Sequence, residues 1–333
     1  MAHRDCFEST FSEAQSSFWT LICVTTRDAE QRAAIEQEVE WLWRCGAIAS
    51  ERIIVVEDPC PDIGSGGSSL NALLVAAEHL CAQRGLSVLS EEVLLESRIL
   101  IIHSGRECGL NRCGSAFMYL GKDTITKEGI RVPRSLFVLQ LLQLTKLAAH
   151  FSNNSFAYVM DVIGIDYCSN KYGNDANVPL VLATFYMPID IATTLLSLHS
   201  VYPLSSCTYY GIDNGSPGLQ LSIFFDFIVA IANGTNEEDF VRERSPHDER
   251  SAKARQILFR RFSRYNAHAC FLNITKYHYF QPADEQNVVV FWNTLTGNSY
   301  RNANEVKKEL FLPALEDSSY AQLSLKSCFQ LNR

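Results

Sequence analysis

The stretch with the clearest chemical potential is Gly-Ser-Gly-Gly-Ser-Ser at residues 64–69, between an apolar strand pattern at 53–56 and an amphipathic helix pattern that begins at Leu70. In a strand, glycine-rich turn and helix, free backbone N–H groups and the positive end of the helix converge on an anion. Glycines let the backbone approach a phosphate closely, and serines add hydroxyl donors. The predicted nucleotide-binding residues are Gly64, Ser65, Gly66, Gly67, Ser68, Ser69 and Asn71.

An alternative interpretation of this stretch is a flexible connection in which Ser68 or Ser69 only caps the following helix. Two better known phosphate loops do not fit, because position 69 is Ser where a dinucleotide fingerprint has its third glycine, and no Lys follows as in a Walker loop. If the glycines do cradle phosphate, a bulky Val at Gly66 or Gly67 is expected to abolish nucleotide-induced stabilisation while leaving the fold largely intact.

Four further side chains are candidates for the chemistry. Arg106 follows the apolar strand pattern at 98–103, so at the carboxyl end of a sheet it is placed to stabilise negative charge on a phosphate. His103 is a candidate ligand contact, and the alternative is a strand-end histidine bonded to backbone. Asp213 lies in the glycine-flanked stretch GIDNGSPG and is a candidate metal or sugar-hydroxyl contact, with a simple Asx turn as the alternative.

Asp226, the fourth, interrupts an apolar run at 219–232 that predicts a buried helix. An unpaired charge is costly in such a helix. Asp226 is therefore expected either to pair internally or to point into the site.

The hydrophobic pattern predicts an α/β fold with a parallel sheet. Apolar strand patterns at 18–24, 53–56 and 98–103 alternate with helix patterns, which is typical of a parallel sheet covered on both faces. The first helix is expected to bury a stripe that includes Ile35, Val39, Leu42 and Trp43. Strand patterns recur at 158–165 and 180–186, and Pro188 is suited to start a helix.

Three segments are predicted. Residues 18–236 form the core, residues 237–266 carry charges of both signs and read as a linker or exposed helix, and residues 267–333 form a small β-rich C-terminal extension.

The formal net charge of −8 argues against a nucleic-acid-coating protein. No apolar run is long enough to cross a membrane, and eleven cysteines without a CxxC pair fit reduced thiols. We therefore expect a cytoplasmic protein.

Several of these stretches together resemble a known family. The matches are VEDP with GSGGSSLNALLVAAEHL, then ILIIHSGRE, CGSAF and CTYYGIDNGSPGLQLSIFFDF. In this order they are similar to the N-terminal, nucleotidyltransferase-like portion of L-fucose kinases and GDP-L-fucose pyrophosphorylases. The resemblance implies a Rossmann-like nucleotidyltransferase core, Mg²⁺ as cofactor, and a nucleoside triphosphate with fucose or fucose 1-phosphate as ligands.

The sequence departs from this family in two places. Family kinases carry a long galactokinase-type C-terminal domain for which the chain has no room, so a complete fucokinase is not expected. Between His150 and Phe156 only about five residues stand where the family pattern has a strand with an aspartate. Three functions follow as alternatives: guanylyl transfer from GTP to fucose 1-phosphate, a weakly active or regulatory nucleotide-binding fragment, and a galactokinase-type small-molecule kinase. The third requires a β-rich domain before the glycine stretch, and only two strand patterns precede it.

Overall fold

The fold was analysed in a computed structural model. The structure describes residues 18–44, 48, 52–105, 113–117, 119–125, 131–148, 156–164, 177–232, 236–244 and 248–271. Arg106 and residues 272–333, which include most of the predicted C-terminal extension, lie outside these ranges.

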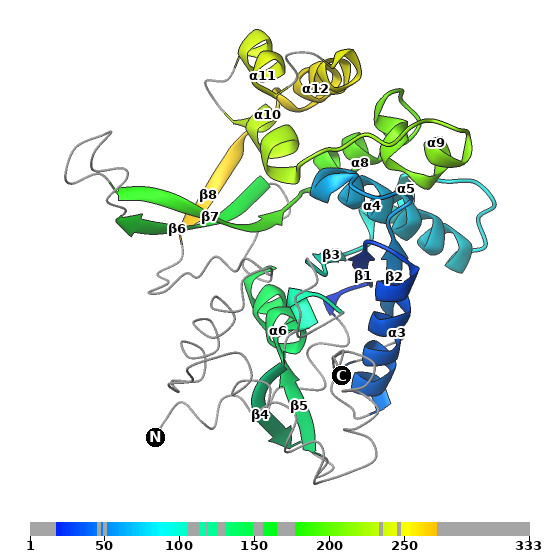
Figure 1. The fold of residues 1–333 in the computed structure, drawn as a ribbon, viewed down its shortest axis with the longest axis vertical. Helices are drawn as coiled ribbons and strands as arrows, with labels where there is room; N and C mark the ends of the chain where they lie inside the picture. The colour runs from blue at the N-terminus through cyan, green and yellow to red at the C-terminus, as the bar shows by residue number, and fades with distance from the viewer. Residues whose placement is uncertain are drawn as a thin grey trace, which may run out of the picture.

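A three-stranded parallel sheet lies near the middle of the molecule (Figure 1). Its strands are β1 (Leu21–Thr26), β2 (Ile53–Glu57) and β3 (Ile99–His103), in the order β2-β1-β3. Both strand pairs are parallel, as the sequence predicted. Every side chain of β1 is buried, as expected for a central strand covered on both faces.

Two long helices connect these strands. Helix α3 (Ala29–Arg44) joins β1 to β2, and α4 (Gly64–Gln83) leads from β2 toward β3. The two crossovers run in opposite directions along the sheet, so right-handed connections place α3 and α4 on opposite faces. The prediction for Trp43 is wrong: its side chain is 46% exposed. It stands one residue, about 100° of rotation, beyond the buried Leu42, and the buried tryptophan of α3 is Trp41.

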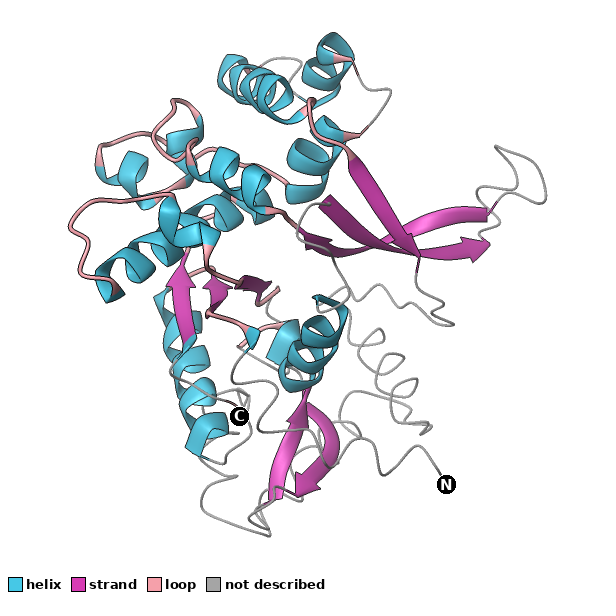
Figure 2. Cartoon of the chain, turned by 180° about the vertical axis from the view of Figure 1, so that it is seen from behind, coloured by secondary structure: helices cyan, strands magenta, loops and turns pink. Residues whose placement is uncertain are grey.

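A second three-stranded sheet has the order β7-β6-β8 and is separate from the first (Figure 2). Strands β6 (Phe156–Gly164) and β7 (Asn177–Tyr186) are antiparallel, while β8 (Ala267–Phe271) pairs with β6 in parallel. The predicted strands at 158–165 and 180–186 are therefore confirmed. The predicted boundary at residue 267 is not supported, because β8 hydrogen-bonds into a sheet whose other strands precede it by about a hundred residues.

The segment between the two sheets contains elements that the sequence did not predict. Strands β4 (Tyr119–Ile125) and β5 (Arg131–Ser135) form an antiparallel pair, followed by α6 (Leu136–Ala148) and preceded by the short helix η2 (Ser115–Phe117).

The shorter helices are α5 (Glu92–Leu95), α8 (Ile189–Leu196), η3 (Leu204–Cys207), α9 (Tyr209–Asp213), η4 (Ile223–Ile228), α10 (Val229–Ile231), α11 (Glu237–Arg244) and α12 (Glu249–Phe262). Of these, α5, α8, η3 and η4 pack against α4, while α11 and α12 pack against each other at the top of the view in Figure 1. Helix α8 begins directly after Pro188, as predicted. The buried helix predicted at 219–232 begins only at Ile223, and the residues before it are extended.

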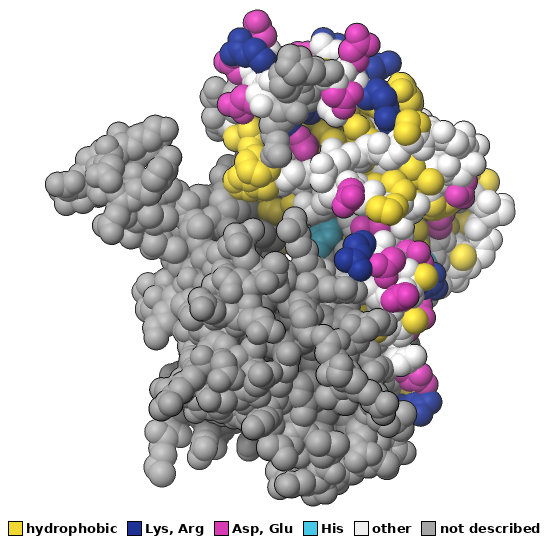
Figure 3. Space-filling model, in the orientation of Figure 1, with side chains coloured by type: hydrophobic (Ala, Val, Ile, Leu, Met, Phe, Trp, Pro, Cys, Tyr) yellow, Lys and Arg dark blue, Asp and Glu magenta, His cyan; other side chains and the backbone are white. Residues whose placement is uncertain are grey.

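The charged segment 237–266 is not a linker. Its two helices expose acidic and basic side chains on the outside (Figure 3), yet Phe240, Ala254, Leu258 and Phe262 are buried in the same hydrophobic core as α4. The last three are spaced four residues apart and form one face of α12. The high charge content of the segment concealed this apolar stripe. Within the described part of the chain no helix is long and apolar enough to span a bilayer.

Candidate functional site

Five polar residues meet at the carboxyl edge of the parallel sheet. Three of them stand at or just after the ends of β1, β2 and β3, and two belong to α4. We call them the strand-end cluster: Thr25, Asp58, His103, Ser68 and Ser69. Open parallel sheets bind ligands at this edge because their loops and helix starts converge there. The geometry therefore makes the cluster the natural place to look for a site.

His103 is bonded through both ring nitrogens. Nδ1 lies 2.9 Å from the Thr25 hydroxyl and Nε2 lies 3.0 Å from the Ser69 hydroxyl. Burial lowers the pKa of His103 to about 4, so the ring is neutral at pH 7, with one nitrogen as donor and the other as acceptor. The alternative of a backbone-bonded histidine is wrong in detail, because its partners are side chains. His103 joins the ends of β1 and β3 to α4.

Asp58 is the acidic member of the cluster, and the sequence prediction missed it. Its Oδ1 accepts a 2.5 Å hydrogen bond from the Ser68 hydroxyl, and its backbone N–H donates to Thr26 O at 2.7 Å. Burial raises the pKa of Asp58 to about 6 against the lowering effect of Ser68, and the charge of Glu57 adds to the rise. Its position directly after an apolar strand pattern is the signal that could have identified it.

The predicted glycine-serine turn is a helix. Helix α4 begins at Gly64, so residues 64–69 form its first turns rather than a loop before it. In a helix, Ser68, Ser69 and Asn71 point toward the sheet and are buried. Asn71 donates to Glu57 O at 3.2 Å and accepts from the Tyr209 backbone N–H at 3.1 Å. These three side chains hold α4 in place, and Ser68 and Ser69 are internal to the helix rather than caps.

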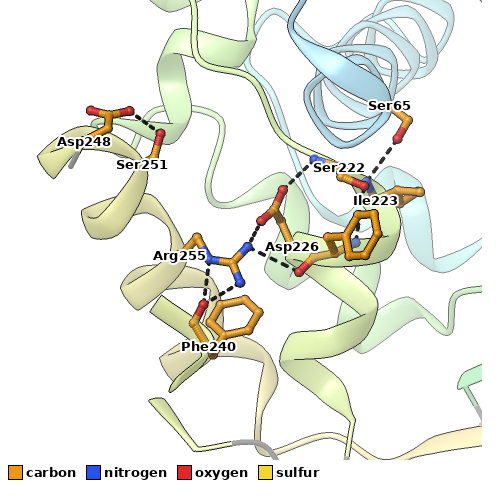
Figure 4. Close-up of polar contacts among 9 residues, drawn as sticks. Ser65, Ser222, Ile223, Asp226, Phe240, Asp248, Ser251 and Arg255 are labelled. Atoms are coloured by element: carbon orange, nitrogen blue, oxygen red, sulfur yellow. Dashed lines mark hydrogen bonds and ion pairs between the residues drawn. The ribbon is translucent and has the colours of Figure 1, made fainter. Parts of the chain in front are cut away.

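Residues 219–226, which we call the covering segment, lie against the glycine-rich start of α4. The Gly66 N–H donates to Leu221 O at 2.8 Å, and the Leu221 N–H donates to Ile63 O at 2.8 Å. The Ile223 N–H donates to the Ser65 hydroxyl at 3.1 Å, an interaction drawn in Figure 4. One of the amides predicted to bind phosphate is thus bonded to a backbone carbonyl of the protein itself.

The glycines make room for this segment. A Cβ at Gly64 would lie 2.2 Å from Leu221 O, and one at Gly66 would lie 2.6 Å from the Phe227 ring. Gly64 also has φ +71°, which strains any residue with a side chain. Val at Gly66 would therefore also press on the backbone of the covering segment, whereas at Gly67 the nearest atoms belong to side chains. Phosphate binding by residues 64–69 stays a prediction.

The structure brings neither Asp226 nor Asp213 into the strand-end cluster. Asp226 is buried and forms an ion pair with Arg255 (Figure 4), which is the internal pairing that the sequence analysis gave as one alternative. Asp213 ends α9 and is exposed. The chain is helical up to Asp213 and turns after it. Gly215 in this turn has φ +81°, and the Gly215 N–H donates to Ile212 O at 2.9 Å.

A metal centre is not found among the described residues. Nowhere among them do three or more His, Cys, Asp or Glu side chains gather as metal ligands. Magnesium commonly keeps several waters and takes one or two carboxylates with substrate phosphates. Asp58 alone does not make such a site, and we derive no catalytic step through a metal ion.

A comparison with protein families finds a similarity that covers part of the chain. Residues 159–306 match the family model for the fucose pyrophosphorylase domain. This stretch of the chain is similar to fucose pyrophosphorylase domains. The match is consistent with the L-fucose kinase and GDP-fucose pyrophosphorylase family that the sequence motifs resemble. No curated protein and no solved structure matches the chain.

The fucose pyrophosphorylase match spans less than half of the chain and divides the candidate residues. Asp213, Asp226 and Arg255 lie within it, whereas the strand-end cluster and the glycine stretch precede it. The match begins within β6 and includes all of β7 and β8, so all three strands of the second sheet contribute to it. The covering segment lies in the matched part, so its hydrogen bonds connect the matched part to the start of α4.

Proposed function

We propose that this protein transfers a guanylyl group from GTP to L-fucose 1-phosphate, releasing pyrophosphate and GDP-fucose. The match of residues 159–306 to the fucose pyrophosphorylase domain carries the proposal. It supports fucose-related nucleotide-sugar metabolism, and guanylyl transfer is the specific activity we infer from it. The same resemblance leads us to propose a cytoplasmic enzyme that uses magnesium.

The proposed reaction requires a sugar phosphate oxygen to attack the α-phosphorus of GTP while pyrophosphate leaves. Such chemistry depends mainly on positioning and on positive charge near the phosphates. We assign the positive charge to Arg106, which follows β3 by three residues. We assign the phosphates to the start of α4 and the sugar hydroxyls to polar side chains of the carboxyl edge.

A second candidate is a weakly active or regulatory nucleotide-binding protein. Two observations favour it: Leu221 O already accepts from the Gly66 amide, and Asp226 is committed to Arg255. On this alternative the chain binds nucleotide weakly and forms GDP-fucose slowly or not at all. The galactokinase-type alternative is disfavoured by the helical conformation of residues 64–69 and by the two strands, β1 and β2, that precede them in the described chain.

Pyrophosphate release from purified protein decides between these functions. GTP, magnesium and fucose 1-phosphate are supplied together, and a full-length member of the family is assayed in parallel. We expect release that requires fucose 1-phosphate. Thermal shifts with GTP, ATP, UTP, GDP-fucose and fucose 1-phosphate, with and without magnesium, identify the preferred ligands. Stabilisation by GTP without pyrophosphate release would favour the second candidate, and phosphorylation of free fucose by ATP would favour the kinase.

A further inference from the structure

The guanidinium of Arg255 on α12 links three segments. It forms the ion pair with Asp226, donates from Nε to Phe240 O at 2.8 Å, and donates from a terminal nitrogen to Phe225 O at 3.3 Å. Its planar group also lies 3.9 Å from the centre of the Phe240 ring. Figure 4 shows these bonds radiating from one buried side chain. Arg255 therefore fixes the covering segment to both α11 and α12.

Asp226 transmits this attachment to the start of α4. Its Oδ2 accepts a 2.6 Å hydrogen bond from the Ser222 backbone N–H, and the Ser222 hydroxyl accepts from the Phe225 N–H at 3.3 Å. The neighbouring residues on either side of Ser222 are the ones that contact α4: Leu221 through Gly66, and Ile223 through Ser65. The chain of contacts runs from α12 to α4 without a gap.

Burial makes this arrangement difficult to open. The side chains of Asp226 and Arg255 are only 9% and 3% exposed. Separating them would leave a charge unpaired in the interior, which costs far more than separating a surface pair. The covering segment cannot leave α4 freely while the ion pair holds Ser222 in place.

We propose that Asp226 and Arg255 are positioning residues that keep the Leu221 carbonyl on the Gly66 amide and so limit the access of phosphate groups to the start of α4. The Leu221 oxygen occupies the place that an anionic oxygen would take at this amide. Nucleotide binding must displace it. This inference rests on the proposed function, in which the glycine stretch meets the phosphates of GTP.

The test replaces the ion pair by apolar side chains in the double variant Asp226→Leu with Arg255→Met, which leaves no unpaired buried charge. The matched control is Glu237→Gln with Arg260→Gln. That pair also joins α11 to α12, at 2.9 Å, but Arg260 is 62% exposed and neither residue bonds to the covering segment. Amide hydrogen exchange is followed at Gly66 and Ile223 in both proteins. Affinity is measured by calorimetry for inorganic triphosphate and for GTP.

We expect faster exchange at both amides and roughly tenfold tighter triphosphate binding in the double variant alone, the change that corresponds to about 1.4 kcal/mol. If the ion pair only stabilises the fold, its replacement should weaken triphosphate binding instead. Unchanged exchange, or faster exchange without tighter triphosphate binding, would overturn the inference. If the double variant does not fold, Asp226→Asn, which removes the ion pair but keeps the shape of the side chain, is measured in the same way, and the same results decide. If the parent protein transfers no guanylyl group but the double variant binds triphosphate more tightly than the parent, the proposed function is refuted and this inference still stands.

Discussion

Replacing Gly66 by Ala tests whether the covering segment packs against α4 as closely as the structure has it. The added Cβ would lie 2.6 Å from the Phe227 ring, 3.0 Å from the Ser222 carbonyl carbon and 3.1 Å from the Ile223 nitrogen. Two of these three neighbours are backbone atoms, which cannot move aside without shifting the segment. Such overpacking costs about 1–3 kcal/mol.

Two further contributions act in opposite directions. Displacing the segment weakens the hydrogen bond from the Gly66 N–H to Leu221 O, with a net cost of about 1 kcal/mol. Alanine gains about 1 kcal/mol over glycine inside a helix. These two contributions nearly cancel, so we expect Gly66→Ala to lower the free energy of unfolding by about 1–3 kcal/mol.

Gly67→Ala is the matched control, one residue along the same helix. Its Cβ would meet the Ile63 and Cys207 side chains at 3.1 Å and 3.2 Å, and side chains can yield by a few tenths of an ångström. The helix-propensity gain then offsets the crowding, and the net change should stay within about 1 kcal/mol. Urea unfolding of the three proteins gives the comparison. A Gly66→Ala variant as stable as the parent or the control would refute the packing argument.

Four other predictions concern stability and activity. Asp226→Ala leaves the buried Arg255 without its carboxylate and should lower the free energy of unfolding by about 3–5 kcal/mol, measured with urea. Asp239→Ala removes an exposed ion pair with Arg242 and an exposed hydrogen bond from Asn236, and should cost under about 0.5 kcal/mol. Equal losses would contradict the burial argument. The pKa of His103 is lowered to about 4, so the unfolded chain binds the proton first as the pH falls from 6.5 toward 4, and the stability contributed by neutral His103 is lost over that range. His103→Gln should make the free energy of unfolding less sensitive to acid in this range. An unaltered pH profile of that free energy would contradict the prediction. The pKa of Asp58 is raised to about 6, so the folded state takes up the proton first and gains stability as the pH falls from 6 to 4; Asp58→Asn should remove this gain and steepen the acid loss over the same range. Arg106→Ala should reduce turnover by a factor on the order of a hundred with a smaller loss of GTP affinity, measured by pyrophosphate release and calorimetry, and equal losses would reduce Arg106 to a binding contact.

The sequence predicted the parallel sheet well because burial on both faces leaves a plain signature. Strands β1, β2 and β3 are continuous apolar runs separated by helices, and no tertiary information is needed to find them. The strands β6 and β7 were predicted from the apolar runs at 158–165 and 180–186 of the sequence. The pairing of β6 with β8 was not predicted, because strand partners about a hundred residues apart leave no local pattern.

The glycine stretch shows why the candidate site was harder to predict. Glycine indicates that some group approaches the backbone closely, but it does not say which group. At Gly64 and Gly66 that group is the covering segment, whose position depends on the ion pair between Asp226 and Arg255. The serines were assigned to a turn because their hydroxyls suit caps, yet as helix residues they bond to Asp58 and His103. Only the folded chain reveals those partners.

The parallel pairing of β6 with β8 also sets an order of events during synthesis on the ribosome. The edge of β6 that pairs with β8 stays without hydrogen bonds until Ala267, about 110 residues after Phe156, has been synthesised. At a translation rate of roughly 5–20 residues per second, that wait lasts on the order of 5–20 s. During this time β7 protects one side of β6 while the other side presents unpaired backbone groups to any neighbouring nascent chain. The helices α11 and α12 emerge within the same interval, so the hairpin that later anchors the covering segment is complete shortly before the strand that closes the sheet.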